Sequence, residues 1–158
     1  MIFIEFEEFK SKCEVLSPED SDFVRECFID EFIDTSSNGY RENILKHLQY
    51  ADGEFYNGYL WDYLKVKNIT KENYIEDVKY LNMTVFVMWD IHSDYKVNIN
   101  NYFKFGKKCV IKTCIETLLL GKRYLPDDIY IFDENFTWYF VFTHEDIYNR
   151  RYCLKYGI

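Results

Sequence analysis

The residues with the clearest chemical potential follow the most apolar run of the chain. Residues 84–90 contain Val-Phe-Val-Met-Trp, and Asp90-Ile91-His92-Ser93-Asp94 comes directly after that run. Carboxylate and imidazole groups are common ligands of divalent metal ions, and sites often form where a buried strand ends. One hypothesis is therefore a small metal-dependent hydrolase or nuclease that uses Asp90, His92 and Asp94.

Other features of the sequence count against metal chemistry. The order Asp-x-His resembles the first motif of metallophosphoesterases, but Trp89 and Ser93 stand where that motif has glycines. Only two further histidines, His47 and His144, could complete a ligand set. The sequence has no GxGxxG, P-loop, HExxH or GxSxG motif. We therefore expect no metal, no cofactor and no catalytic residue.

A second polar group, His144-Glu145-Asp146, follows another apolar run. An imidazole beside carboxylates can perform general acid–base catalysis, although such residues also simply end a strand. If the protein is a hydrolase, His92 and His144 must lie at the same end of the sheet.

The charge distribution points to a protein partner. The net charge is −8, and residues 5–34 contain 11 acids against 3 bases. Acidic surfaces repel nucleic acid and attract basic proteins. Residues 104–123 carry six bases against one acid, which makes a nucleic-acid site there an alternative, but the acidic half of the chain opposes it. We expect no nucleic-acid partner.

The composition predicts one globular domain over residues 1–158, with 48% hydrophobic and 29% charged residues. Five cysteines without paired spacing predict free thiols rather than a disulfide framework. The start of the chain lacks a basic segment, and no apolar run reaches 18 residues. We therefore expect a cytoplasmic protein that does not bind membranes. The sequence carries no indication of an oligomeric state.

Apolar periodicity and capping residues predict helices in the first half of the chain. The best start is Ser17-Pro18, which opens a helix to about Asp34. At 100° per residue, one stripe away from the apolar face contains Glu19, Asp22, Glu26, Asp30 and Asp34, whereas Glu31 falls near the apolar face. The predicted helices cover residues 5–16, 17–34, 40–50, 54–65, 70–80 and 109–120.

The second half predicts strands. Asp128–Phe132 and Thr137–Thr143 form a β-hairpin, 84–90 a buried strand and 150–156 a short last strand. The order of elements indicates an α+β fold, with N-terminal helices packed on one face of a small, mostly antiparallel sheet from the C-terminal half. Trp89 and Trp138 should lie on the sheet, at least one of them buried, with Trp138 facing the helix 109–120. Trp61 should be the exposed ring.

Five short runs together resemble small bacterial proteins of uncharacterised families. They are Gly58-Tyr59-Leu60-Trp61-Asp62, Met88-Trp89-Asp90, Leu125-Pro126-Asp127-Asp128-Ile129-Tyr130-Ile131-Phe132-Asp133, Phe136-Thr137-Trp138 and Thr143-His144-Glu145. Some of these proteins resemble immunity proteins of contact-dependent and polymorphic toxin systems. The resemblance implies a cytoplasmic bacterial protein that binds and neutralises a cognate toxin, often a basic nuclease.

The resemblance and the charge pattern agree on a non-catalytic binding protein. Such a protein needs acidic residues for steering and large rings as anchors. The candidate partner-binding residues are Glu19, Asp22, Glu26, Asp30, Asp34, Trp61 and Asp62.

Overall fold

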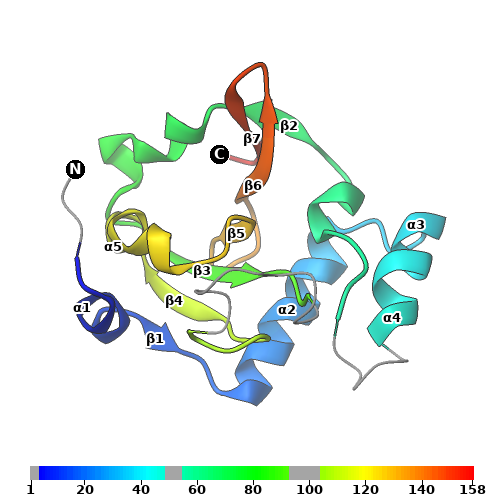
Figure 1. Ribbon diagram of the computed structural model, residues 1–158, viewed down its shortest axis with the longest axis horizontal. Coiled ribbons are helices and arrows are strands. Elements are labelled where there is room, and N and C mark those ends of the chain that lie inside the picture. Colours follow the sequence, from blue (N-terminus) through cyan, green and yellow to red (C-terminus); the bar gives the residue numbers. More distant parts are fainter. Residues whose placement is uncertain (1–3, 49–54, 93–103) are drawn as a thin grey trace.

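Helices cover both faces of one antiparallel sheet in this α+β protein (Figure 1). The computed structural model describes residues 4–48, 55–92 and 104–158 of the chain. Seven strands pair in the order β1-β4-β3-β5-β6-β7-β2, and every pair is antiparallel. Their bounds are β1 Glu14–Val15, β2 Asn68–Thr70, β3 Thr84–Trp89, β4 Ile111–Cys114, β5 Ile129–Phe132, β6 Tyr139–Ile147 and β7 Arg150–Tyr156.

The helices are short apart from one. The α-helices are α1 Phe6–Ser11, α2 Pro18–Phe32, α3 Asn38–Tyr40, α4 Lys46–Leu48 and α5 Ile115–Gly121. A π-helical turn, η1 Arg41–Leu45, joins α3 to α4. The 3-10 turns are η2 Leu60–Tyr63, η3 Glu72–Glu76, η4 Val78–Tyr80 and η5 Lys122–Tyr124. As its sequence predicts, α2 begins at Pro18, and the Ser17 hydroxyl accepts a hydrogen bond from the Asp20 amide at 3.1 Å.

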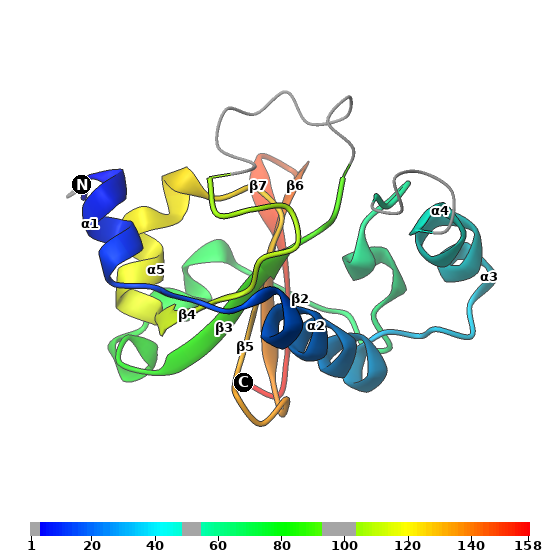
Figure 2. The ribbon, with the colours of Figure 1, turned by 90° about the horizontal axis from the view of Figure 1, so that it is seen from below.

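The central strands are apolar on both faces because both faces are covered. Ile129 and Ile131 of β5 belong to a core that includes residues of α1 and α5, whereas Tyr130 and Phe132 belong to a core that includes residues of α2. Figure 2 shows the sheet between α1 and α5 on one side and α2, α3 and α4 on the other. The expectation that helices cover a single face was therefore wrong, because alternate residues of the same strands are buried on each side.

Three predicted helices have other structures. Of the predicted helix 54–65, the described residues 55–65 contain the 3-10 turn η2 and a single β-bridge residue, Leu64, and no α-helix. Residues 70–80 contain the end of β2 followed by η3 and η4. The range 109–120 divides into β4 and α5. Ile111–Cys114 becomes a strand because it pairs with β1 on one side and β3 on the other. Local apolar spacing predicted a helix there, and pairing with distant strands overrode it.

Two of the three tryptophans are buried as expected, although Trp138 lies immediately before β6 and not within a strand. Trp89 and Trp138 are buried, and Trp138 shares its core with Ile115 and Leu118 of α5. Trp61 is also buried, with only 5% of its surface exposed, so the prediction that it is the exposed ring was wrong.

The β6–β7 hairpin extends past the rest of the sheet at the top of Figure 1. Residues 144–150 are all exposed, and Tyr148 is 95% exposed. Tyr148 and Asn149 form the turn with positive φ angles of 52° and 62°, as a two-residue hairpin connection requires.

Candidate functional site

The outer face of α2 combines exposed acids with an exposed aromatic ring. Glu19, Asp22, Glu26 and Asp30 are all exposed, as the predicted acidic stripe requires. Phe23 lies among them on the same side of the helix and is 65% exposed. We call these five residues the α2 outer face. Sequence reasoning missed Phe23, although a large apolar residue inside an acidic stripe was a visible signal.

The opposite side of α2 is fixed to the body of the protein. Val24, Phe28 and Phe32 are buried in the core on that face of the sheet. Arg25 is buried as well, and its Nε donates to the Lys108 carbonyl at 2.9 Å while its Nη2 donates to the Trp89 carbonyl at 2.8 Å. These contacts prevent rotation of α2, so the outer face has a fixed orientation toward solvent.

The carboxylates of the α2 outer face make no ion pair with any residue in the described ranges 4–48, 55–92 and 104–158. Asp34, the last residue of the predicted stripe, differs from them. It follows α2 and accepts hydrogen bonds from the Ser36 amide and hydroxyl, which lower the pKa of its carboxyl group. Asp34 therefore shapes a turn, and the surface available to a partner is centred on α2.

A second group of polar residues surrounds Asp90, behind the segment 56–64. Asp90 is 1% exposed, accepts from the Leu60 amide at 2.8 Å and accepts from the Tyr130 hydroxyl at 2.8 Å. The same Tyr130 hydroxyl accepts from the Trp61 amide at 2.9 Å. Burial raises the pKa of Asp90 to about 8, with a further contribution from the charge of Asp128. Asp90 is therefore mostly protonated at neutral pH.

Asp128 is the second buried carboxyl group of this site. Its Oδ1 accepts from the Trp61 indole Nε1 at 3.0 Å and from the His144 amide at 3.0 Å, and its Oδ2 lies 3.0 Å from His144 Nδ1. The indole bond explains why Trp61 is buried, because an indole N–H taken from water needs an acceptor. Asp128 and Tyr130 were missed from sequence. Their signal was the two-residue period that places both on one face of the predicted strand 128–132.

The two histidines of the hydrolase hypothesis lie at the same end of the sheet. The His92 ring centroid is 4.7 Å from that of Tyr59, and the His144 ring centroid is 4.8 Å from it. His92 Nε2 lies 3.0 Å from the Gly58 carbonyl oxygen. Asp94 lies outside the described residues.

Asp62 and Glu145 are exposed beside this group. Desolvation raises the pKa of Asp62, and the charges of Glu145 and Asp128 raise it further. The two carboxylates and the half-buried ring of Tyr59 therefore form a negatively charged border around His144.

The arrangement of the described residues can orient the His144 imidazole. A buried carboxylate at Nδ1 fixes the tautomer of His144 and leaves Nε2 to act as a base. Within the described parts of the chain, no group of three or more His, Cys, Asp or Glu residues is arranged to hold a metal ion. Asp90 and His92 instead contact the segment 56–64, which they help to hold.

Comparisons with protein-family models, with curated proteins and with solved structures find no match. No helix in the described residues is long and apolar enough to cross a membrane.

The raised pKa of Asp90 predicts a pH-dependent stability. Between the ordinary carboxyl pKa near 4 and the folded value of about 8, the folded state binds more protons than the unfolded state. The contribution of Asp90 to the free energy of unfolding is therefore complete below about pH 4 and is lost as the pH rises toward 8. The expected slope is at most about 1.4 kcal/mol per pH unit for one proton.

Urea unfolding between pH 5 and pH 8 measures this contribution when the wild type is compared with Asp90→Asn. The stability of the wild type relative to the variant should fall with rising pH. Asp22→Asn, at an exposed carboxylate, is the control and should follow the wild type. A constant difference between wild type and Asp90→Asn over this range would contradict the assignment.

Proposed function

We propose that this chain is a non-catalytic protein of immunity type, which binds a basic protein toxin in the bacterial cytoplasm and neutralises it. The observation that carries the proposal is the α2 outer face, where four carboxylates without an ion pair to any described residue surround one exposed phenylalanine on an immobilised helix. The resemblance in sequence to immunity-like proteins supports the same reading.

The chemistry of the face suits a cationic partner. Exposed carboxylates on one helix raise the rate of encounter with a positively charged protein by roughly 10- to 1,000-fold at low salt. Phe23, 65% exposed, offers an apolar anchor with acidic residues around it. Binding energy at interfaces concentrates in a few such rings, enclosed by contacts that exclude water.

A nuclease is the toxin class that this face suits best. A nuclease must neutralise phosphates with lysines and arginines, so its substrate-binding surface is cationic. An acidic inhibitor can cover that surface directly and compete with the nucleic acid. We expect the gene immediately upstream to encode a large secreted or modular toxin, whose toxic domain is the binding partner for the following experiment.

Charge reversal on α2 should slow association with that toxic domain. Replacing Asp22, Glu26 and Asp30 by lysine should lower the association rate constant at low salt by about tenfold or more and remove most of its salt dependence. Stopped-flow or surface plasmon resonance at several salt concentrations measures both effects.

The control is a second triple variant with the same change in charge. Glu5, Glu7 and Glu14 are exposed acids that belong to α1, to β1 or to the residue before α1, and none of them is part of α2. Their replacement by lysine should change the association rate much less. Equal rates for the two triple variants would mean that α2 is not the docking face.

A second candidate function, a small hydrolase, is favoured by the Asp128–His144 pair. His144 is oriented by a buried carboxylate and its side chain is 40% exposed, so water and substrate can reach its free nitrogen. The reaction would use His144 as a general base on water.

Hydrolysis of ester and phosphodiester substrates, with and without Mg²⁺, Mn²⁺ or Zn²⁺, tests this candidate. General base catalysis predicts that His144→Gln lowers the rate by about 100-fold or more, because such catalysis contributes roughly 10²–10⁴. His47→Gln, at a half-buried histidine outside the group, is the control. No turnover by the wild type, or equal turnover by His144→Gln, would exclude this candidate.

A further inference from the structure

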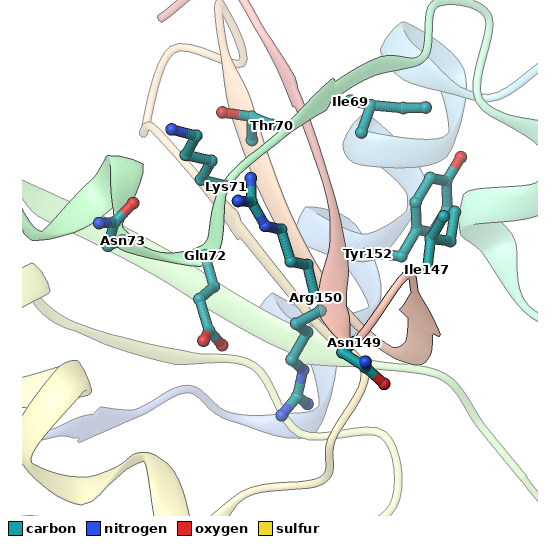
Figure 3. Close-up of a pocket in the computed structure, with 10 residues that line it drawn as sticks. Ile69, Thr70, Lys71, Glu72, Asn73, Ile147, Asn149, Arg150 and Tyr152 are labelled. Atoms are coloured by element: carbon teal, nitrogen blue, oxygen red, sulfur yellow. The ribbon is translucent and has the colours of Figure 1, made fainter.

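A groove with a volume of about 610 Å³ lies between the β2–η3 connection and the β6–β7 hairpin (Figure 3). The groove begins at the end of β2, where pairing with β7 stops at Thr70 and the chain continues into η3. Its lining residues are Ile69, Thr70, Lys71, Glu72, Asn73, Ile147, Asn149, Arg150, Arg151 and Tyr152. The volume falls in the range of pockets that hold small molecules, roughly 300–1,000 Å³.

Two exposed cations line this groove on a chain whose net charge is −8. Lys71 comes from the β2–η3 side and Arg150 from the hairpin side. In the ranges that the structure describes, neither side chain has a hydrogen bond or an ion pair. Both are therefore available to an anion.

Arg151 has a different role in the groove wall. Its Nε donates to the Thr143 carbonyl at 2.6 Å and its Nη2 to the Asp127 carbonyl at 2.8 Å, with the Asp127 carboxylate 3.6 Å away. These contacts hold β7 and its neighbour Arg150 in a defined position.

The groove is divided into a polar and an apolar side. Ile69, Ile147 and Tyr152 lie together in Figure 3, apart from Lys71, Glu72 and Asn73. Ile69 is 67% exposed and Ile147 is 42% exposed, so both offer apolar surface that water now covers. The Tyr152 ring makes an edge contact with the Trp61 ring, with ring centroids 5.8 Å apart. A flat, apolar group could pack on this side.

We propose that the groove binds a nucleoside monophosphate. The phosphate would lie between Lys71 and Arg150, because an ammonium and a guanidinium are the side chains that best recognise phosphate oxygens. The base would pack against Ile69, Ile147 and Tyr152. Glu72, the one acid of the groove, would accept hydrogen bonds from the ribose hydroxyls, as acidic residues do in dinucleotide sites.

Isothermal titration calorimetry with AMP, adenosine and inorganic phosphate tests the proposal. AMP should bind the full chain with a Kd below about 1 mM. Adenosine lacks the phosphate and inorganic phosphate lacks the base, so each should bind at least about tenfold more weakly, the effect of losing roughly one charged or apolar contact.

Substitutions at the groove cations should weaken AMP binding. Lys71→Gln combined with Arg150→Gln should raise the Kd about tenfold or more, since each charge-assisted contact contributes substantially. Lys10→Gln combined with Arg41→Gln removes two exposed cations that do not line the groove, and should leave the Kd unchanged.

Three results would overturn the proposal. They are no binding of AMP at about 1 mM, the same Kd for wild type and the groove double variant, and binding of inorganic phosphate as tightly as AMP. None of these results bears on the α2 outer face, which does not line the groove.

Discussion

Two buried carboxyl groups fasten the segment 56–64 to the sheet. Asp90 holds the Leu60 amide directly and the Trp61 amide through Tyr130, and Asp128 holds the Trp61 indole. Apart from the 3-10 turn η2 and the bridge residue Leu64, residues 56–64 belong to no helix or strand, so their backbone N–H groups depend on other acceptors. Buried backbone and indole N–H groups cost about 1–3 kcal/mol each when left without an acceptor. The carboxyl groups supply those acceptors, and burial raises the pKa of Asp90 to about 8.

The segment 56–64, held by the two carboxyl groups, also contacts the C-terminal end of α2. The Asp34 amide donates to the Tyr63 carbonyl at 2.7 Å, the Lys65 amide donates to the Phe32 carbonyl at 2.9 Å, and Ile33 and Leu64 form a β-bridge. The C-terminal end of α2 is therefore tied to a segment that the sheet carboxyls hold. Arg25 fixes the middle of the same helix through the Trp89 and Lys108 carbonyls. A preorganised helix loses little conformational entropy on binding, which is what the proposed docking face requires.

The parts of the fold that sequence predicted well are those with strong local signals. Ser17 and Pro18 located the start of α2, and alternation located the hairpin of β5 and β6. The failures came from non-local interactions. Ile111–Cys114 has helical spacing but pairs with two strands, and Ile69 joins β2 because β7 offers a free edge.

Candidate-site residues with a local sequence signal could be predicted, and those placed by distant contacts could not. The acids of α2 were predictable because a solvent-facing stripe follows from helical period alone. Trp61 was assigned to the surface because its acceptor, Asp128, lies 67 residues away in sequence. The roles of Asp128 and Tyr130 depend on the register that sets β5 beside β3, and neither composition nor local spacing encodes that register.

Amide hydrogen exchange at Leu60 and Trp61 tests the central role of the buried carboxyl groups most directly. Both amides should exchange only through unfolding of the whole protein, with a protection free energy close to that of the β5 amides. In Asp90→Ala, both amides should exchange before the sheet unfolds. Rapid exchange at Leu60 and Trp61 in the wild type, or protection unchanged by Asp90→Ala, would mean that the buried carboxyl groups do not hold this segment.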